Sequence, residues 1–208
     1  MFVVTVDQIG SRRVGDRVEG LLADLVDPDV VGGGGGAATR GFERTVGDEV
    51  QAAFSDADAV VEVALRVLRI GGWSVGIGAG AVDEPMPASV RAAQGPAFVL
   101  AREAVEAAKS RMRAVPIAVR GQGRDGAADA EAVLTLLGAV LARRTPAGWA
   151  AVDAVRSQPG ATQDDVAARL GITQQAVSQR LRTALWSEEL AARTAAGRLL
   201  VSAEAAGS

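Results

Sequence analysis

The chain has 208 residues, of which 49% are hydrophobic, and it carries a formal net charge of −3 at pH 7. This length fits one large or two small domains with a buried core, and the hydrophobic content argues against a disordered chain. Because cysteine and histidine are both absent, disulfides, thiolate metal sites and histidine-based acid–base chemistry are excluded. The acidic balance and the 3% of aromatic residues argue against a general polyanion binder or a base-stacking platform, so any DNA contact must be local.

The sequence also bears on where the protein works. The first residues, MFVVTVDQIG, lack the basic start and long apolar run of a secretory signal. The longest apolar segment, residues 130–142, is too short to cross a bilayer. We therefore expect a cytoplasmic protein with no membrane partner.

The beginning of the chain predicts a strand, a helix and a connector. A β-branched run at residues 2–6 is typical of a buried strand, and residues 11–26 have the apolar spacing of a helix. Five consecutive glycines follow at residues 32–36. A phosphate-binding loop would continue with Lys and then Ser or Thr, which are missing, so these glycines predict a flexible connector.

The next elements predict an α+β domain. Residues 41–46 and 50–54 form a predicted hairpin with its tip at 47–49, and a helix at 56–70 follows. The glycines in the predicted strand at 73–82 indicate close approach of another backbone. A helix at 94–111 and a strand at 115–120 come next. The order βαββαβ is that of a ferredoxin-like sandwich, which has an antiparallel sheet with two helices on one face.

Residues 121–126 predict a polar hinge, and we place a domain boundary there. The predicted parts are a domain at 1–122, a connecting helix within 123–145 and an all-α helix-turn-helix domain at 146–208. The apolar face of the connecting helix fits either a dimer seam or packing against its own chain. Further helices are predicted from Thr145-Pro146 onward and at 187–201, without a strand pair that would form a β-wing.

The most specific pattern is TQDDVAARLGITQQAVSQRLR at residues 162–182. Thr162 is a predicted cap of a first helix with Asp165 in its first turn, and Gly171 suits a tight turn. Thr173 is the predicted cap of a second helix, on which residues 177, 181 and 185 recur on one apolar face. This order predicts a helix-turn-helix, which places its second helix in the major groove of DNA.

Polar side chains gather on the second helix of this motif, with no acidic residue among them. The predicted DNA-contacting residues are Gln163, Thr173, Gln174, Gln175, Ser178, Gln179 and Arg182. Glutamine bonds bidentately to adenine, serine and threonine reach bases or phosphates, and arginine pairs with guanine or phosphate. The predicted partner is therefore double-stranded DNA, and a purely structural helical hairpin is the alternative.

Two acidic residues in the first domain invite a chemical interpretation. Asp7 ends the first strand and Asp48 lies at the hairpin tip, where the sheet is expected to bring them together. Paired carboxylates of this kind suit Mg²⁺. Alternatively, Asp7 caps the helix near Ser11 and Asp48 bonds its own turn, and spacing alone favours these structural roles.

Four blocks of sequence carry a family resemblance. VTVDQIGSRR, FERTVGDEVQAAF, WSVGIGAG and GPAFVLAREAVEAAK, in this order, resemble the SatD family of small bacterial proteins, whose members carry a helix-turn-helix after this domain. More remotely, the blocks resemble the catalytic domains of class III nucleotide cyclases and GGDEF-type diguanylate cyclases. That resemblance implies metal binding by Asp7 and Asp48, and ligand contacts by Arg44, which lies at a purine-selecting position, and by Glu49.

The chain departs from the cyclase pattern at the residues that stabilise the transition state. Val99 stands where class III cyclases have Asn, and Arg102 is one position early on its helix. The hairpin has Val46 in place of the first glycine of GGDEF. Because phosphoryl transfer depends on positioned charge at the phosphate, we expect no useful turnover of nucleoside triphosphates.

Three functions compete at this point. The first is a DNA-binding regulator in which a cyclase-like domain senses a ligand or dimerises, and we expect it to act as a homodimer. The second is a divergent Mg²⁺-dependent nucleotide-binding protein or cyclase. The third is an interaction module that recruits RNA polymerase, because TQDDVAARLGITQQAVSQRLRTA also resembles sigma-factor region 4.

Overall fold

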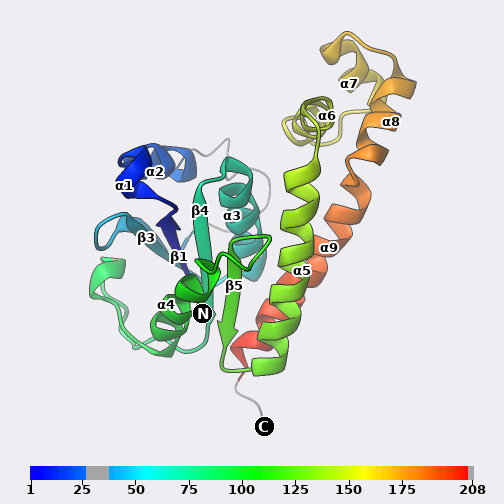
Figure 1. Ribbon diagram of the computed structural model, residues 1–208. Helices are drawn as coiled ribbons and strands as arrows, with labels where there is room; N and C mark the ends of the chain where they lie inside the picture. Colours follow the sequence, from blue (N-terminus) through cyan, green and yellow to red (C-terminus); the bar gives the residue numbers. More distant parts are fainter. Residues whose placement is uncertain (27–37, 206–208) are drawn as a thin grey trace.

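A computed structural model describes residues 1–26 and 38–205, so the five glycines at 32–36 lie outside the described residues. The described chain is a mixed α+β structure with one sheet in the order β2-β3-β1-β4-β5 (Figure 1). The strands are β1 (Phe2–Gln8), β2 (Arg40–Arg44), β3 (Glu49–Phe54), β4 (Trp73–Ala79) and β5 (Ile117–Gly121). Strand β1 runs antiparallel to β3 and β4, whereas β5 is parallel to β4 because helix α4 (Pro96–Ala108) connects them.

Helices cover both faces of this sheet, which makes it three layers deep. Helices α2 (Val18–Val26) and α3 (Ala57–Ile70) share one apolar core with alternate residues of β1, β3 and β4. Helix α4 packs on the opposite face. A Cβ at Gly76 or Gly78 would overlap the α4 backbone, so these glycines of β4 permit the close approach that the sequence predicts.

The predicted helix at residues 11–26 is wrong in one respect, because it is divided. Helix α1 (Ser11–Val14) ends at Gly15, whose φ is 79°, and α2 begins three residues later. The Gln8 side chain fills the break: its amide nitrogen donates to the Gly15 carbonyl at 2.6 Å, and its oxygen accepts from the Arg17 nitrogen at 2.9 Å. The apolar periodicity continues across this break and therefore conceals it.

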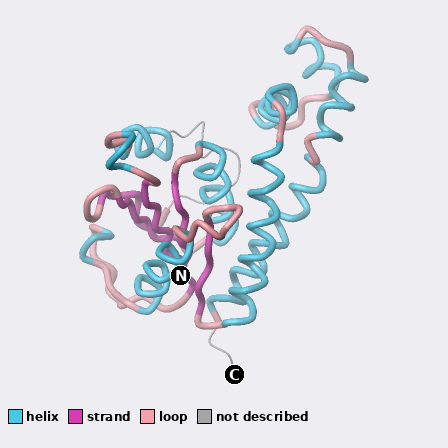
Figure 2. The backbone as a smooth tube through the Cα atoms, in the orientation of Figure 1, coloured by secondary structure: helices cyan, strands magenta, loops and turns pink. Residues whose placement is uncertain are grey.

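The remaining helices form a long antiparallel pair that carries a small helical unit at one end. The pair consists of α5 (Arg124–Arg143) and α9 (Trp186–Glu204), which lie side by side along the β5 edge of the sheet (Figures 1 and 2). Between them come α6 (Pro146–Arg156), α7 (Gln163–Leu170) and α8 (Gln174–Thr183). These three helices, called the helix-turn-helix unit below, project beyond the sheet (Figure 1).

The predicted hinge at residues 121–126 is instead a packing seam. A Cβ at Gly121 or Gly123 would overlap the backbone at the carboxyl end of α9, and one at Gly126 would lie 2.7 Å from the Ala203 nitrogen. Helix α9, which was expected to stay in the carboxy-terminal domain, returns to the sheet and is held there. Glycine is required at these positions because two backbones meet there. A seam of this kind is therefore as rich in glycine as a flexible hinge.

The apolar face of α5 packs within its own chain. Together with α9 it joins the core that lies on α3, through Ala130, Leu134, Leu137, Leu141, Ala196, Leu200 and Ala203. This is the second of the two roles that the sequence allowed for the helix. Within residues 1–26 and 38–205, no helix combines the length and apolar character needed to cross a bilayer.

A buried ion pair joins the two corners at which the chain enters and leaves the helix-turn-helix unit. Arg144, between α5 and α6, pairs with Glu189 in the first turn of α9, and both side chains are at most 1% exposed. Arg144 also donates to the Ala184 carbonyl, at the end of α8, at 2.7 Å. Its guanidinium lies 4.5 Å from the Trp149 ring of α6.

We predict that Gly121→Ala lowers the free energy of unfolding by about 1–3 kcal/mol, because the added methyl group overpacks the seam with α9. Gly20→Ala is the matched control, since nothing lies within 4 Å of a Cβ at that position of α2. The control should gain about 0.5–1 kcal/mol from its lower unfolded-state entropy. Urea unfolding of both variants measures the difference, and an equal effect at the two positions would contradict the seam.

We predict that Glu189→Gln destabilises the protein by about 3–5 kcal/mol, because it leaves the buried Arg144 charge without its partner. Glu188→Gln changes the neighbouring, exposed carboxylate and should cost less than about 0.5 kcal/mol. Chemical unfolding followed by circular dichroism measures both. Similar stability of the two variants would show that Arg144 does not depend on this pair.

Candidate nucleic-acid interface

Helix α7 begins and ends as its sequence predicts. The Thr162 hydroxyl accepts from the Asp165 nitrogen at 3.2 Å, and the Asp165 carboxylate accepts from the Thr162 nitrogen at 2.8 Å, which completes a capping box. The Thr162 hydroxyl also donates to the Asp165 carboxylate at 2.7 Å, and this bond, with the bond from the Thr162 nitrogen, holds the pKa of Asp165 below its ordinary value. Gly171 follows the helix with a φ of 64°, so the chain turns sharply toward α8.

A small apolar core holds α8 against α6 and α7. Val177 is fully buried beside Val166 and Ala167 of α7 and Ala154 of α6. Leu181 packs against the same cluster, as its spacing predicts. The prediction that residue 185 is buried is wrong, because Leu185 has a φ of 54° at the start of α9 and is 43% exposed. The apolar stripe of α8 therefore ends at Leu181.

The opposite face of α8 is polar and open. Gln175, Gln179 and Arg182 are exposed and are separated by four and three residues, so they lie along one side of the helix. The Arg182 guanidinium lies 3.5 Å from the Gln179 oxygen. Helix α8 contains no acidic residue, and its amino-terminal end favours negative charge. This face has the chemistry to bond base edges and phosphates.

The other predicted contact residues are engaged or partly covered. The Gln174 amide donates to the Gln163 oxygen at 2.6 Å, which ties the start of α8 to the start of α7. The Thr173 hydroxyl accepts from the Ala176 nitrogen at 3.2 Å and caps α8. Ser178 is half-buried. Helix α7 carries exposed charges of both signs, Asp164 and Arg169, and Arg169 donates to the Ser157 hydroxyl after α6.

The sheet brings the predicted metal residues together, but a lysine lies among them. Asp7 pairs in register with Glu49, and the Gln8 nitrogen donates to the Asp48 carbonyl at 3.4 Å. The Lys109 ammonium lies 3.0 Å from an Asp7 oxygen. Burial raises the pKa of Asp7, and the nearby charges of Asp48 and Glu49 add to this effect against the opposing influence of Lys109.

These residues do not fit a preformed magnesium site. The Lys109 cation is bound to Asp7 on one side and to Glu106, at 2.6 Å, on the other. Among residues 1–26 and 38–205, no group of three or more acidic side chains is arranged to hold a metal ion. A divalent cation would have to displace the ammonium group before it reached Asp7.

The predicted nucleotide-contacting residues are also engaged. Arg44 donates to Asp16 at 2.7 Å and to the Gly47 carbonyl at 2.6 Å. The Glu49 carboxylate accepts from the Thr45 hydroxyl at 2.6 Å. Thus Arg44 braces the hairpin, and a phosphate or base would have to compete with bonds inside the protein.

The residues at which the cyclase pattern fails lie in a different hollow from Asp7. Val99 and Arg102 line a hollow of about 630 Å³ beside the hairpin residue Val46. Asp7 and Lys109 line another, of about 440 Å³. The predicted metal ligand and the residues of the cyclase signature are therefore separated in this structure.

Sequence reasoning missed Lys109 and a group of arginines on α3, α6 and α9. Lys109 follows the last turn of α4, and only the packing of α4 on β1 brings it to Asp7. The arginines belong to separate helical patterns, and no local signal shows that they converge.

Neither a scan against models of protein families nor searches of curated proteins and solved structures found a match to this chain. The resemblance to the SatD family therefore stays a prediction that rests on the four sequence blocks.

We predict that Asp7→Asn leaves the stability at pH 7 unchanged or higher. Because the folded-state pKa of Asp7 is raised, its charge is disfavoured on folding, and this cost is present above the folded pKa. The cost disappears as the pH falls below the ordinary pKa, so the advantage of the variant should shrink toward pH 3. Urea unfolding across pH 3–7, with the exposed Asp24→Asn as control, measures it. A marked loss at pH 7 would show that the pair with Lys109 outweighs burial.

Proposed function

We propose that this protein binds double-stranded DNA and regulates transcription through its helix-turn-helix unit. The observation that carries the proposal is the open face of α8, where Gln175, Gln179 and Arg182 are exposed on a helix without acidic residues. Gln174 and Thr173 shape the start of that helix. A purely structural hairpin would not require such a face.

The chemistry of this face suits major-groove recognition. Glutamine amides match the donor and acceptor on adenine, and the guanidinium of Arg182 matches guanine or a phosphate. The amino-terminal end of α8 and the Arg169 side chain of α7 supply further positive potential. The acidic residues of α7 and the overall negative charge limit non-specific affinity, so recognition depends on a few base contacts.

For the sheet unit we propose a ferredoxin-like, cyclase-related origin with a sensing or dimerising role in place of catalysis. The order and directions of β1 to β4 support this proposal. The protein is proposed to act as a dimer, because two modules on half-sites about one helical turn apart gain affinity that one module lacks. The apolar face of α5 is used within the chain and does not supply the seam.

The two other functions have distinct tests. Conversion of ATP or GTP to a cyclic product with Mg²⁺ or Mn²⁺, lost in Asp48→Ala, would favour a cyclase. The bonds of Asp7 and Arg44 within the protein argue against it. Binding of purified RNA polymerase in the absence of DNA binding would favour the sigma-like module.

We predict that the protein retards its own upstream DNA in a gel shift and that Gln175→Ala/Gln179→Ala abolishes the specific complex. Each lost base contact is expected to cost about 1–3 kcal/mol, so the double variant should bind at least tenfold more weakly. Gln94→Ala, an exposed glutamine of the sheet unit, is the matched control. Unchanged binding by the folded double variant would rule out α8 as the recognition helix.

A further inference from the structure

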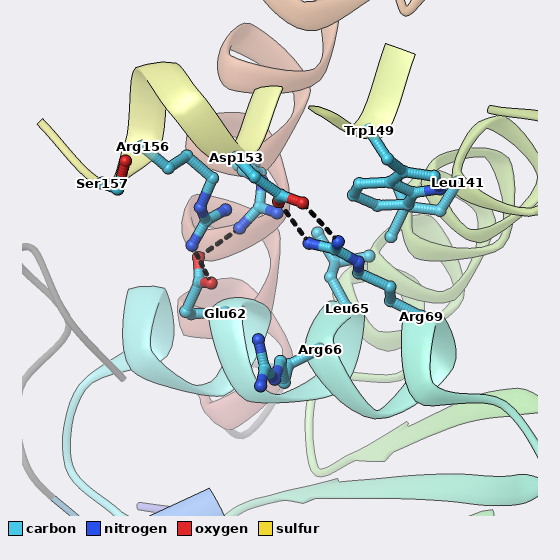
Figure 3. Close-up of a pocket in the computed structure, with 10 residues that line it drawn as sticks. Glu62, Leu65, Arg66, Arg69, Leu141, Trp149, Asp153, Arg156 and Ser157 are labelled. Atoms are coloured by element: carbon cyan, nitrogen blue, oxygen red, sulfur yellow. Dashed lines mark hydrogen bonds and ion pairs between the residues drawn. The ribbon is translucent and has the colours of Figure 1, made fainter. Parts of the chain in front are cut away.

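A basic cavity lies where the helix-turn-helix unit meets the sheet unit (Figure 3). Its volume is about 200 Å³. Helix α3 supplies one wall through residues spaced three and four apart, and α6 supplies the opposite wall. The lining residues used below are Glu62, Arg66, Arg69, Trp149, Asp153, Arg156 and Arg193.

Positive charge exceeds negative charge around this cavity. Four arginines and two carboxylates line it, which leaves a formal excess of two positive charges. Arg69 donates to both oxygens of Asp153, at 2.6 and 2.7 Å, and Glu62 is shared by Arg156 and Arg193. Adding the adjacent buried pair of Arg144 and Glu189 leaves the excess unchanged.

Arg66 contributes one of these two excess charges. It lies on α3 between Glu62 and Arg69, and no dashed line reaches it in Figure 3. Its Nε atom is enclosed and has no hydrogen-bond partner in the described part of the chain. A buried donor in this state is costly, because it has lost water without gaining an acceptor. The two carboxylates of the cavity are bound to Arg69, Arg156 and Arg193, so the Nε atom of Arg66 is left without an acceptor.

We propose that this cavity binds a small dianion whose oxygens accept hydrogen bonds from Arg66 and its neighbouring arginines. Guanidinium groups bind carboxylate and phosphate oxygens in pairs, and two negative charges match the excess. The volume is smaller than that of cavities for drug-sized ligands, so it admits a group of the size of phosphate or a short dicarboxylate. Trp149 closes one side, with the Arg69 guanidinium 3.8 Å from its ring.

The cavity joins the two units, so its ligand contacts α3 of the sheet unit and α6 of the helix-turn-helix unit together. Any effect of the anion on DNA rests on the proposed DNA-binding function. Binding of the anion does not depend on DNA binding, and it is measured here in the absence of DNA. Its failure and the failure of DNA binding are therefore distinguishable.

Thermal unfolding of the full chain in inorganic phosphate, succinate or chloride at matched ionic strength tests the site. A dianion that binds the folded state but not the unfolded state raises the melting temperature. At concentrations above Kd, the increase grows with the logarithm of the dianion concentration. We expect phosphate or succinate to do so, with Arg66→Gln abolishing the increase. Arg198→Gln, which removes an exposed charge near the other end of α9, should keep it. Equal increases in all three proteins, or none in the wild type, would overturn the proposal.

Tryptophan fluorescence gives a second readout that does not depend on the stability of Arg66→Gln. Trp149 lines the cavity, so the stabilising anion should change the emission of the wild type. Trp149→Phe should lose this response. An anion response that persists in Trp149→Phe would place the binding site elsewhere and overturn the proposal.

Discussion

The orientation of the helix-turn-helix unit depends on the buried pair of Arg144 and Glu189. Arg144 follows the end of α5 and Glu189 lies in the first turn of α9, so their ion pair joins the two ends of the segment that contains α6, α7 and α8. A charge is costly to bury unless its donors find acceptors. The Nε and Nη2 atoms of Arg144 find them in Glu189 and the Ala184 carbonyl, whereas Nη1 has no hydrogen-bond partner in the described part of the chain. Hydrogen bonds are directional, so this pair fixes how the two corners of the chain are arranged. An apolar contact between the same corners would be less directional.

From this pair, alternating charges extend to the sheet unit. Glu189 also binds Arg193, Arg193 binds Glu62 of α3, and Glu62 binds Arg156 of α6. The helix-turn-helix unit thus contacts α3 through ion pairs at the edge of a cavity, whereas α5 and α9 contact it through an apolar core. Polar contacts of this kind exchange partners more readily than packed side chains do. The junction is therefore the natural place for an ionic ligand to act.

Local signals in the sequence predict local structure well here. The capping box at Thr162, the turn at Gly171 and the buried Val177 all follow from neighbours within a few residues. The contacts of Gly123 with Ser202 and of Lys109 with Asp7 join residues roughly 80 to 100 positions apart, and no local pattern encodes them. For that reason the sequence predicts a hinge at residues 121–126 and a metal ligand at Asp7, and it gives no sign of the lysine beside Asp7.

The same long-range contacts connect the cavity to the recognition helix. Arg69 lines the cavity and stacks on Trp149, and Arg144 lies 4.5 Å from that ring. Arg144 then binds the carbonyl of Ala184, the residue that ends α8. If the proposed anion bound Arg69 in place of Asp153, it would act on a side chain that contacts Trp149, whose ring also lies against Arg144. The contacts are contiguous, but coupling requires two arrangements of this junction with different affinity for the anion. A bound anion would satisfy the buried Nε donor of Arg66, which has no partner among the described residues, so the proposed site lies on this series of contacts.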